Sequence, residues 1–134
     1  MQAQAVTHLH HYIRRWDLRP DGSPFFTASS LLQPVIFQDI PAMIKIAMQE
    51  EEDRGSRLMH CWNGNGTVPV LKYETPALLM ERAARGHPDS LAEMAAGGKD
   101  DEASRILCHV ADRLHAAGST PPSFLFPLSD WFRE

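Results

Sequence analysis

The chain has 134 residues, 43% of them hydrophobic, so it has the length of one small domain and enough apolar side chains for a core. Its net charge of -4 excludes a general nucleic-acid-binding surface, which needs a basic stripe. No apolar run approaches the ~18 residues that cross a bilayer, and the first residues lack the apolar core of a signal peptide. We therefore expect a cytoplasmic protein that binds neither nucleic acid nor membranes.

The first part of the chain predicts extended structure after an irregular start. Residues 1–12 show no clear hydrophobic period and are predicted to form a loose N-terminal segment. The sequence PDGS at residues 20–23 predicts a turn between two extended runs. The stretch LLQPVIFQDIPAMIKIA that follows predicts two strands joined near Gln38 and Asp39.

A helix is predicted next, over QEEEDRGSRLMHCW at residues 49–62. Four acids in a row lie in its first turn, where the helix dipole favours negative charge. The sequence NGNG at residues 63–66 ends this helix. The stretch VPVLKYETPALLMERA then predicts a hairpin that turns at residues 74–76. The order to this point is three strands, one helix and two strands.

Beyond residue 84 the pattern is helical. PDSLAEMAAGG predicts a short helix opened by residues 88–89 and closed by glycines. DDEASRILCHVADRLHAAG predicts a longer helix that Asp100 or Asp101 caps and Gly118 ends. The Pro-rich stretch STPPSFLFPLSDWFRE predicts a connector and the first turn of another helix at Ser129. The apolar positions of the longer helix follow the helical period: Ala103, Ile106, Leu107, Val110, Leu114 and Ala117.

A single lysine interrupts the apolar strand PAMIKIA. Strand alternation places Lys45 on the face opposite Ile44 and Ile46. A buried ammonium group without a partner costs several kcal/mol, so Lys45 needs an anion or water. Glu52 shares the inward helical face and is the expected partner, with Glu51 as the alternate.

The remaining acids, Glu50 and Asp53, are expected to be solvated charges, with Glu50 in line with Arg57.

Two interpretations of this lysine and these acids remain open on local pattern. The first is an edge strand with a snorkelling lysine, followed by a helix whose acids serve the dipole, and spacing alone favours it. The second is the strand lysine and helix glutamate of a kinase amino-terminal lobe, in which the lysine orients nucleotide phosphates and the glutamate holds the lysine. The order of three strands, a helix and two strands favours the second.

Several stretches, taken together, resemble one known family. They are RWDLRPDG, SSLLQPV, PAMIKIA, WNGNG, ALLMERA, GKDDEASRILC, RLHA and PLSDWF, in this order from about residue 15 to the end. They are similar to the amino-terminal part of the aminoglycoside (streptomycin) 6-phosphotransferases, which are grouped with the hydroxyurea phosphotransferases. The set is far more specific than any single stretch, because a lone strand lysine proves little.

This resemblance implies a fold, a donor and a metal ion. The fold class is α+β, a kinase-like amino-terminal lobe with an antiparallel sheet of about five strands and one helix, followed by two or three helices that begin a carboxyl-terminal lobe. The implied domains are a nucleotide-binding lobe over residues 13–84 and a helical part over residues 85–134. ATP is the implied phosphoryl donor, Mg²⁺ the implied bridging ion, and an alcohol group on an aminoglycoside the implied acceptor.

The resemblance also implies residues that bind nucleotide. Lys45 matches the phosphate-orienting lysine, and Glu52, or alternatively Glu51, matches its helix partner. The stretch ALLMERA matches the strand that enters the hinge, where the backbone of residues 81–83 would meet the adenine edge. The binding residues implied there are Glu81 and Ala83, with the apolar side chains of Leu79 and Met80 beside them.

The loop TASSLL falls where a loop between the first two strands of the lobe covers the phosphates. Ser29 and Ser30 would offer backbone N–H and hydroxyl donors there, although a turn capped by serines explains these residues equally well.

The catalytic half of the implied machinery is missing from the sequence. A loop of the form H-G-D-x-x-x-x-N and a second, metal-binding aspartate are required, and neither is present. The sole H-x-D, His87-Pro88-Asp89, has Met94 rather than asparagine five positions beyond and is interpreted as a helix cap. We therefore expect a truncated, inactive fragment with no catalytic or metal-binding residues of its own, which meets an aminoglycoside only if the carboxyl-terminal half is supplied. The alternative is a non-catalytic binding or interaction module, or the relic of a truncated gene.

Other reactive side chains fit no known site. The histidines and cysteines lack the spacing of a zinc site. Cys61 and Cys108 are expected to be buried thiols rather than a disulfide. Trp62, Trp131 and Phe132 are expected to be packing anchors, and the last two would be exposed if a further lobe is absent.

Overall fold

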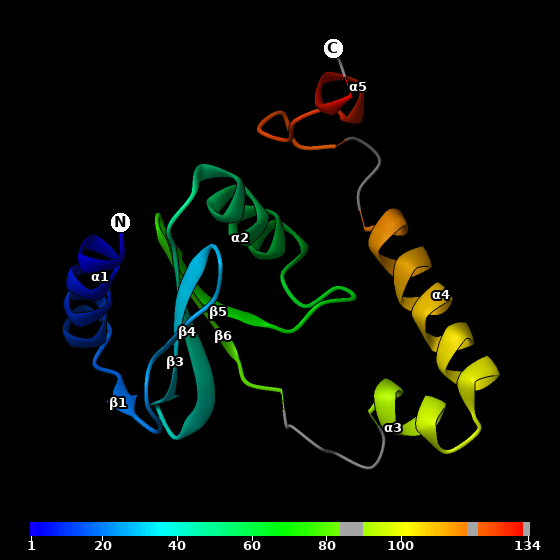
Figure 1. The fold of residues 1–134 in the computed structure, drawn as a ribbon, viewed down its shortest axis with the longest axis horizontal. Helices are drawn as coiled ribbons and strands as arrows, with labels where there is room; N and C mark the ends of the chain where they lie inside the picture. The colour runs from blue at the N-terminus through cyan, green and yellow to red at the C-terminus, as the bar shows by residue number, and fades with distance from the viewer. Residues whose placement is uncertain (84–89, 118–120, 133–134) are drawn as a thin grey trace.

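The computed structural model describes residues 1–83, 90–117 and 121–132, in which helices flank one sheet and a helical segment follows it (Figure 1). The sheet is antiparallel, with the spatial order β1-β3-β4-β6-β5 and β2 paired to β3. This confirms the α+β class and the kinase-like lobe followed by helices. The strands are β1 (Arg19–Pro20), β2 (Phe25–Phe26), β3 (Ser30–Phe37), β4 (Ile40–Ala47), β5 (Val70–Glu74) and β6 (Ala77–Glu81).

The hairpin of β3 and β4 is the centre of the sheet, and its two strands are joined where the sequence predicts. Gln38 and Asp39 form the turn, and both have positive φ, of 48° and 65°. Such a two-residue turn matches the right-handed twist of the strands. The register pairs Leu32 with Lys45, and on the other side of β4 Lys45 pairs with Leu78 of β6. Lys45 therefore lies in the middle of the central strand of the sheet.

Helix α1 (Gln2–Arg15) covers one face of the sheet, so the prediction of a loose segment over residues 1–12 is wrong. Ala5, Leu9, Tyr12 and Trp16 recur every three or four residues and are at most 8% exposed. They form one narrow apolar stripe that packs on the sheet. The polar residues between them, histidines and glutamines above all, concealed this period. The core therefore lies between α1 and the sheet face formed by Leu31, Val35, Phe37, Ala42, Ile44, Ile46, Ala77 and Leu79.

Two polar contacts fasten the end of α1 to the sheet. The Tyr12 hydroxyl donates a hydrogen bond to the carbonyl of Thr75 over 3.3 Å, and Arg15 pairs with Glu74 at 3.0 Å. The Arg15 pair is half exposed and adds little to stability. The buried stripe, rather than these contacts, holds the helix in place.

Helix α2 (Glu50–Trp62) lies on the other side of the sheet from α1 (Figure 1). It starts with the acids, as predicted, and ends at Asn63, which has a left-handed conformation with φ of 45° and donates its N–H to the carbonyl of Met59. The hairpin of β5 and β6 follows, also as predicted. Cys61 lies nine residues, about two and a half turns, beyond Glu52 and therefore on the outer side of α2. Its exposure contradicts the prediction of a buried thiol.

Three helices follow the sheet: α3 (Leu91–Ala96), α4 (Asp100–Ala116) and α5 (Leu128–Trp131). Ser90 caps α3 by accepting the N–H of Glu93, whereas the predicted opening at Pro88-Asp89 lies outside the described residues. The N-cap of α4 is Lys99, so the prediction of Asp100 or Asp101 as its cap is wrong. Asp100 and Asp101 lie one and two positions after Lys99, in the first turn, where they still complement the helix dipole. The predicted stop at Gly118 also lies outside the described residues.

Apolar side chains of the last helices remain exposed. On α4, Ala103 is 5% exposed, but Leu107 is 57% exposed, and Cys108 beside it is exposed rather than buried as predicted. Trp131 and Phe132 are 53% and 82% exposed. They match the expectation of an exposed pair and not that of packing anchors. Among the described residues, no helix is both long enough and apolar enough to cross a membrane.

Candidate functional site

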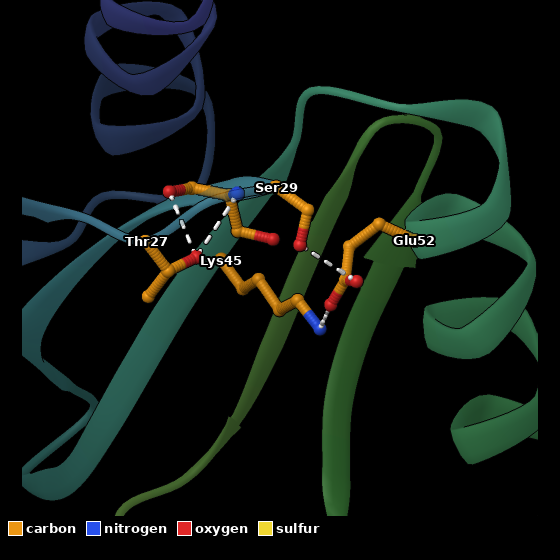
Figure 2. A network of polar contacts seen from close by, with 5 residues as sticks. Thr27, Ser29, Lys45 and Glu52 are labelled. Atoms are coloured by element: carbon orange, nitrogen blue, oxygen red, sulfur yellow. Dashed lines mark hydrogen bonds and ion pairs between the residues drawn. The ribbon is translucent and has the colours of Figure 1, made fainter.

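Lys45 and Glu52 form an ion pair across the gap between β4 and α2 (Figure 2). The Lys45 Nζ contacts Glu52 Oε1, and the two side chains are 16% and 30% exposed. Lys45 is on this face because β4 alternates, and Glu52 reaches it because α2 begins soon after β4 ends. The structure therefore contains the expected pairing of these two residues. Neither charge is left alone in a partly desolvated position, which would be costly.

The second carboxylate oxygen of Glu52 has its own partner. The Ser29 hydroxyl donates a hydrogen bond to Glu52 Oε2 over 2.9 Å (Figure 2). The Lys45 hydrogen bond lowers the pKa of Glu52 from its ordinary value, partial burial opposes this, and the Ser29 hydrogen bond adds to the lowering. Glu52 therefore carries its negative charge at neutral pH and keeps it further into acid than a free glutamate.

The neighbouring acids have other surroundings. Glu51, the alternate partner, is exposed and forms no ion pair among the described residues. Glu50 pairs with Arg54 one turn along the helix at 2.9 Å, and not with Arg57, but its 81% exposed side chain is solvated as expected. Asp53 is not a free solvated charge, because it accepts a hydrogen bond from the Tyr73 hydroxyl at 3.0 Å. Helix α2 therefore directs one carboxylate, that of Glu52, to the strand lysine.

The turn between β2 and β3 is held by its own hydrogen bonds. Thr27 donates its N–H to the carbonyl of Ser30 over 2.8 Å, and the Thr27 hydroxyl oxygen accepts the Ser30 N–H at 3.1 Å (Figure 2). Sequence reasoning missed Thr27, although a threonine three residues before the start of a strand is a recognisable side-chain turn. These bonds commit the Ser30 N–H, and the Ser29 hydroxyl is committed to Glu52. The Ser29 N–H makes no hydrogen bond in the described part of the chain, so it is the donor that remains.

At the end of β6, part of the backbone expected to meet an adenine edge, residues 81–83, already forms hydrogen bonds within the protein. The N–H groups of Glu81 and Arg82 are already bonded to the carbonyls of Pro69 and Pro41, each over 3.1 Å. Met80 lies on the same face of the sheet as Lys45. Leu79 does not, because alternation turns it into the core under α1, where it is fully buried. Its predicted place beside the nucleotide is therefore wrong.

Ligands for a metal ion are not gathered near this pair. In the described ranges, no three histidine, cysteine, aspartate or glutamate side chains lie close enough together to hold a metal ion. The oxygen-rich coordination that Mg²⁺ prefers is therefore not formed by the residues that the structure describes.

The free energy of unfolding is expected to fall in acid because of Glu52. The folded-state pKa of Glu52 lies below its ordinary value of 4.5, so between these two values the unfolded chain binds a proton that the folded chain does not. The contribution of Glu52, about 1 kcal/mol for a half-buried pair, is present above the ordinary value and lost below the lowered one. Urea unfolding of wild type and Glu52→Gln at about pH 6 and about pH 4 measures how much less stable the variant is. This difference in the free energy of unfolding should be smaller at the lower pH. Glu50→Gln, an exposed change on the same helix, should show a much smaller difference.

Comparison with known proteins agrees with this geometry. Residues 15–134 match the family model described as aminoglycoside/hydroxyurea antibiotic resistance kinase. The chain is 48% identical over 121 residues to a streptomycin 3''-kinase of Klebsiella pneumoniae, covering 90% of this chain and 45% of the relative. It is 31% identical over 113 residues to a streptomycin 6-kinase of Streptomyces griseus, covering 81% of this chain and 35% of the relative.

The chain thus spans less than half the length of each of these relatives. No solved structure matches it. The family match covers almost the whole chain and includes the strand and helix that hold Lys45 and Glu52. This chain belongs to the aminoglycoside/hydroxyurea antibiotic resistance kinase family.

Proposed function

We propose that this chain carries the nucleotide-holding part of an ATP-dependent phosphotransferase that modifies an alcohol group of an aminoglycoside such as streptomycin. The observation that carries this proposal is the ion pair of Lys45 and Glu52, formed between a central strand and the helix after it. The names of the two relatives support streptomycin as the acceptor. Because those names differ in the position phosphorylated, the proposal leaves the position on the drug open.

Lys45 is the residue proposed to hold the phosphates. Its ammonium group has three N–H donors, and one of them is directed to Glu52. The other donors are available to phosphate oxygens. Glu52 holds the ammonium group in place and occupies one of its donors. The uncommitted Ser29 N–H, in the turn that ends next to this pair, is a second proposed phosphate donor. Ser30 is proposed only as part of that turn, since its own N–H is committed.

The adenine is proposed to lie along the end of β6. Met80 supplies an apolar surface on the face of Lys45, and the backbone beyond Glu81 supplies the polar edge. Since the N–H groups of Glu81 and Arg82 are committed, the proposed donor to adenine is the N–H of Ala83. Small-molecule sites are typically lined by apolar side chains with a few well-placed polar groups such as a backbone N–H.

The described residues do not by themselves fit a Mg²⁺ site, and we assign no step to the metal ion. The sequence also lacks the H-G-D-x-x-x-x-N loop whose aspartate accepts the proton of the acceptor alcohol. The proposed role of these 134 residues is therefore donor binding, and aminoglycoside phosphorylation needs a catalytic aspartate from elsewhere. A second candidate, a non-catalytic interaction module, is favoured by the exposed aromatic side chains of Trp131 and Phe132.

The experiment that tests the proposal separates binding from turnover. The purified chain is titrated with ATP and, as the matched control, with adenosine, following tryptophan fluorescence and melting temperature. ATP is expected to bind weakly but at least tenfold more tightly than adenosine, because Lys45 acts on phosphate, and one charged hydrogen bond is worth about 1.5–3 kcal/mol. With labelled ATP and streptomycin, the same chain is expected to form no phosphorylated drug.

Two results would count against these expectations. If ATP binds no better than adenosine, or not at all, donor binding fails and the interaction module becomes the better account. If labelled streptomycin accumulates in amounts comparable to the protein, the chain has a catalytic base of its own and the assignment of donor binding alone is wrong.

A further inference from the structure

Glu52 is held on both of its carboxylate oxygens by residues from two different elements. Lys45 of β4 contacts Oε1, and the Ser29 hydroxyl, from the turn before β3, donates to Oε2 over 2.9 Å (Figure 2). A carboxylate held on one oxygen can rotate about its last bonds, whereas one held on both oxygens has a single orientation. The Ser29 contact therefore restricts the orientation in which Glu52 faces Lys45.

The backbone places the Ser29 hydroxyl without any help from a ligand. The Ser29 carbonyl accepts the N–H of Met48 over 2.8 Å, which ties the turn to the residue that follows β4. On the other side, Thr27 closes the turn through its N–H and its hydroxyl oxygen. The backbone of Ser29 is thus held in this turn, from which its hydroxyl reaches Glu52 in the first turn of α2. Such preorganisation is what a group that orients another side chain requires.

The hydroxyl cannot serve a phosphate and Glu52 as donor at the same time, because it has a single hydrogen. If the hydroxyl donated to a phosphate, it would have to release Glu52, which would lose that hydrogen bond and keep the ion pair with Lys45. The observed geometry therefore separates the two donors of Ser29, both of which the sequence resemblance directed to phosphate. Its N–H is free, and its hydroxyl is engaged with the helix glutamate.

We propose that Ser29 is a positioning residue, whose hydroxyl orients Glu52 and, through Glu52, the ammonium group of Lys45. It joins the turn that covers the nucleotide side of the sheet to helix α2. Displacement of either element breaks the Ser29 contact and loosens the ion pair. The part of this inference that concerns nucleotide binding rests on the proposed function, whereas the orientation of Glu52 does not.

The first test needs no nucleotide. The carboxyl carbon of Glu52 is titrated by NMR in wild type, Ser29→Thr and Ser29→Val. Threonine and valine have the same shape and the same branched Cβ, so they differ in the hydroxyl alone. The titration midpoint is expected to rise by about half a pH unit or more in Ser29→Val, since a hydrogen bond to the charged form is lost, and to stay near wild type in Ser29→Thr. Ser29→Ala repeats the comparison if valine impairs folding, and Ser104→Ala on the exposed face of α4 serves as the surface control.

The second test measures ATP and adenosine affinity in the same variants. Loss of the hydroxyl in Ser29→Val is expected to weaken ATP binding about fivefold, as one net hydrogen bond of about 1 kcal/mol implies. Adenosine affinity should not change, and Ser29→Thr should bind ATP as wild type does. An unmoved Glu52 midpoint in Ser29→Val overturns the proposal. So does weaker ATP binding with an unmoved midpoint, which would make the hydroxyl a direct phosphate ligand. A moved midpoint with no ATP binding in any variant, wild type included, supports the positioning of Glu52 and refutes the proposed function instead.

Discussion

Replacement of Lys45 by alanine is expected to weaken ATP binding by about 10- to 100-fold while leaving adenosine binding unchanged. The change removes a charged donor to phosphate, worth about 1.5–3 kcal/mol, and each 1.4 kcal/mol is a factor of ten in affinity. Titration calorimetry, or displacement of a fluorescent ATP analogue, measures the difference directly. The loss should be specific to nucleotides that carry phosphates, because Lys45 lies mid-strand while the adenine is proposed to lie at the end of β6.

Lys72→Ala is the matched control for this prediction. Lys72 lies on the neighbouring hairpin, but its register places it opposite Leu79, on the α1 face of the sheet, with its ammonium group 5.9 Å from the centre of the Phe37 ring. Both variants lose one positive charge, and only Lys45→Ala loses it beside Glu52. Equal loss of ATP affinity in the two variants would mean that net charge, and not the position of Lys45, governs binding, and the proposed site would be wrong.

Leu9→Ala is expected to lower the free energy of unfolding by about 3 kcal/mol and the melting temperature by about 10 °C. Leu9 is 1% exposed and is the central member of the α1 stripe against the sheet. Its truncation leaves a cavity where the core is closed by a single helix. Total stability of a domain of this size is about 5–15 kcal/mol, so a loss of this size is a large fraction of it. Thermal and urea unfolding followed by circular dichroism give both quantities.

His10→Ala controls for any general effect on the helix, because His10 is the next residue along α1 and is exposed. It is expected to change the free energy of unfolding by no more than about 0.5 kcal/mol. A Leu9→Ala variant as stable as His10→Ala would show that α1 does not pack on the sheet. The prediction of a loose N-terminal segment would then be restored.

Local pattern was enough for the elements that build the ion pair. The two-residue period of β4 placed Lys45 away from Ile44 and Ile46, and the helical period of α2 favoured Glu52 over Glu51. Both periods follow from backbone geometry within one element, so they are visible in the sequence. The turn at Gln38 and Asp39 and the end of α2 at Asn63 are likewise local.

The predictions that failed concern contacts between elements. The stripe of α1 is narrow and begins with an alanine, Ala5, and its importance appears only when a sheet face needs cover. The exposure of Cys61 depends on which side of α2 meets the sheet. The hydrogen bond from Ser29 to Glu52 joins residues 23 positions apart, with a strand pair folded between them. No periodicity within one segment encodes such a contact.

By itself, the sequence determined the alternation that puts a lysine on one face of a central strand, the acidic start of the next helix, and the resemblance to a kinase family. These depend on residue type and on spacing within single elements. The tertiary structure alone decided that α1 closes the core, that the N–H groups of Glu81 and Arg82 are already committed, and that the Ser29 hydroxyl serves Glu52. The physical reason is that one donor makes one hydrogen bond at a time, and its partner is decided only when distant segments meet.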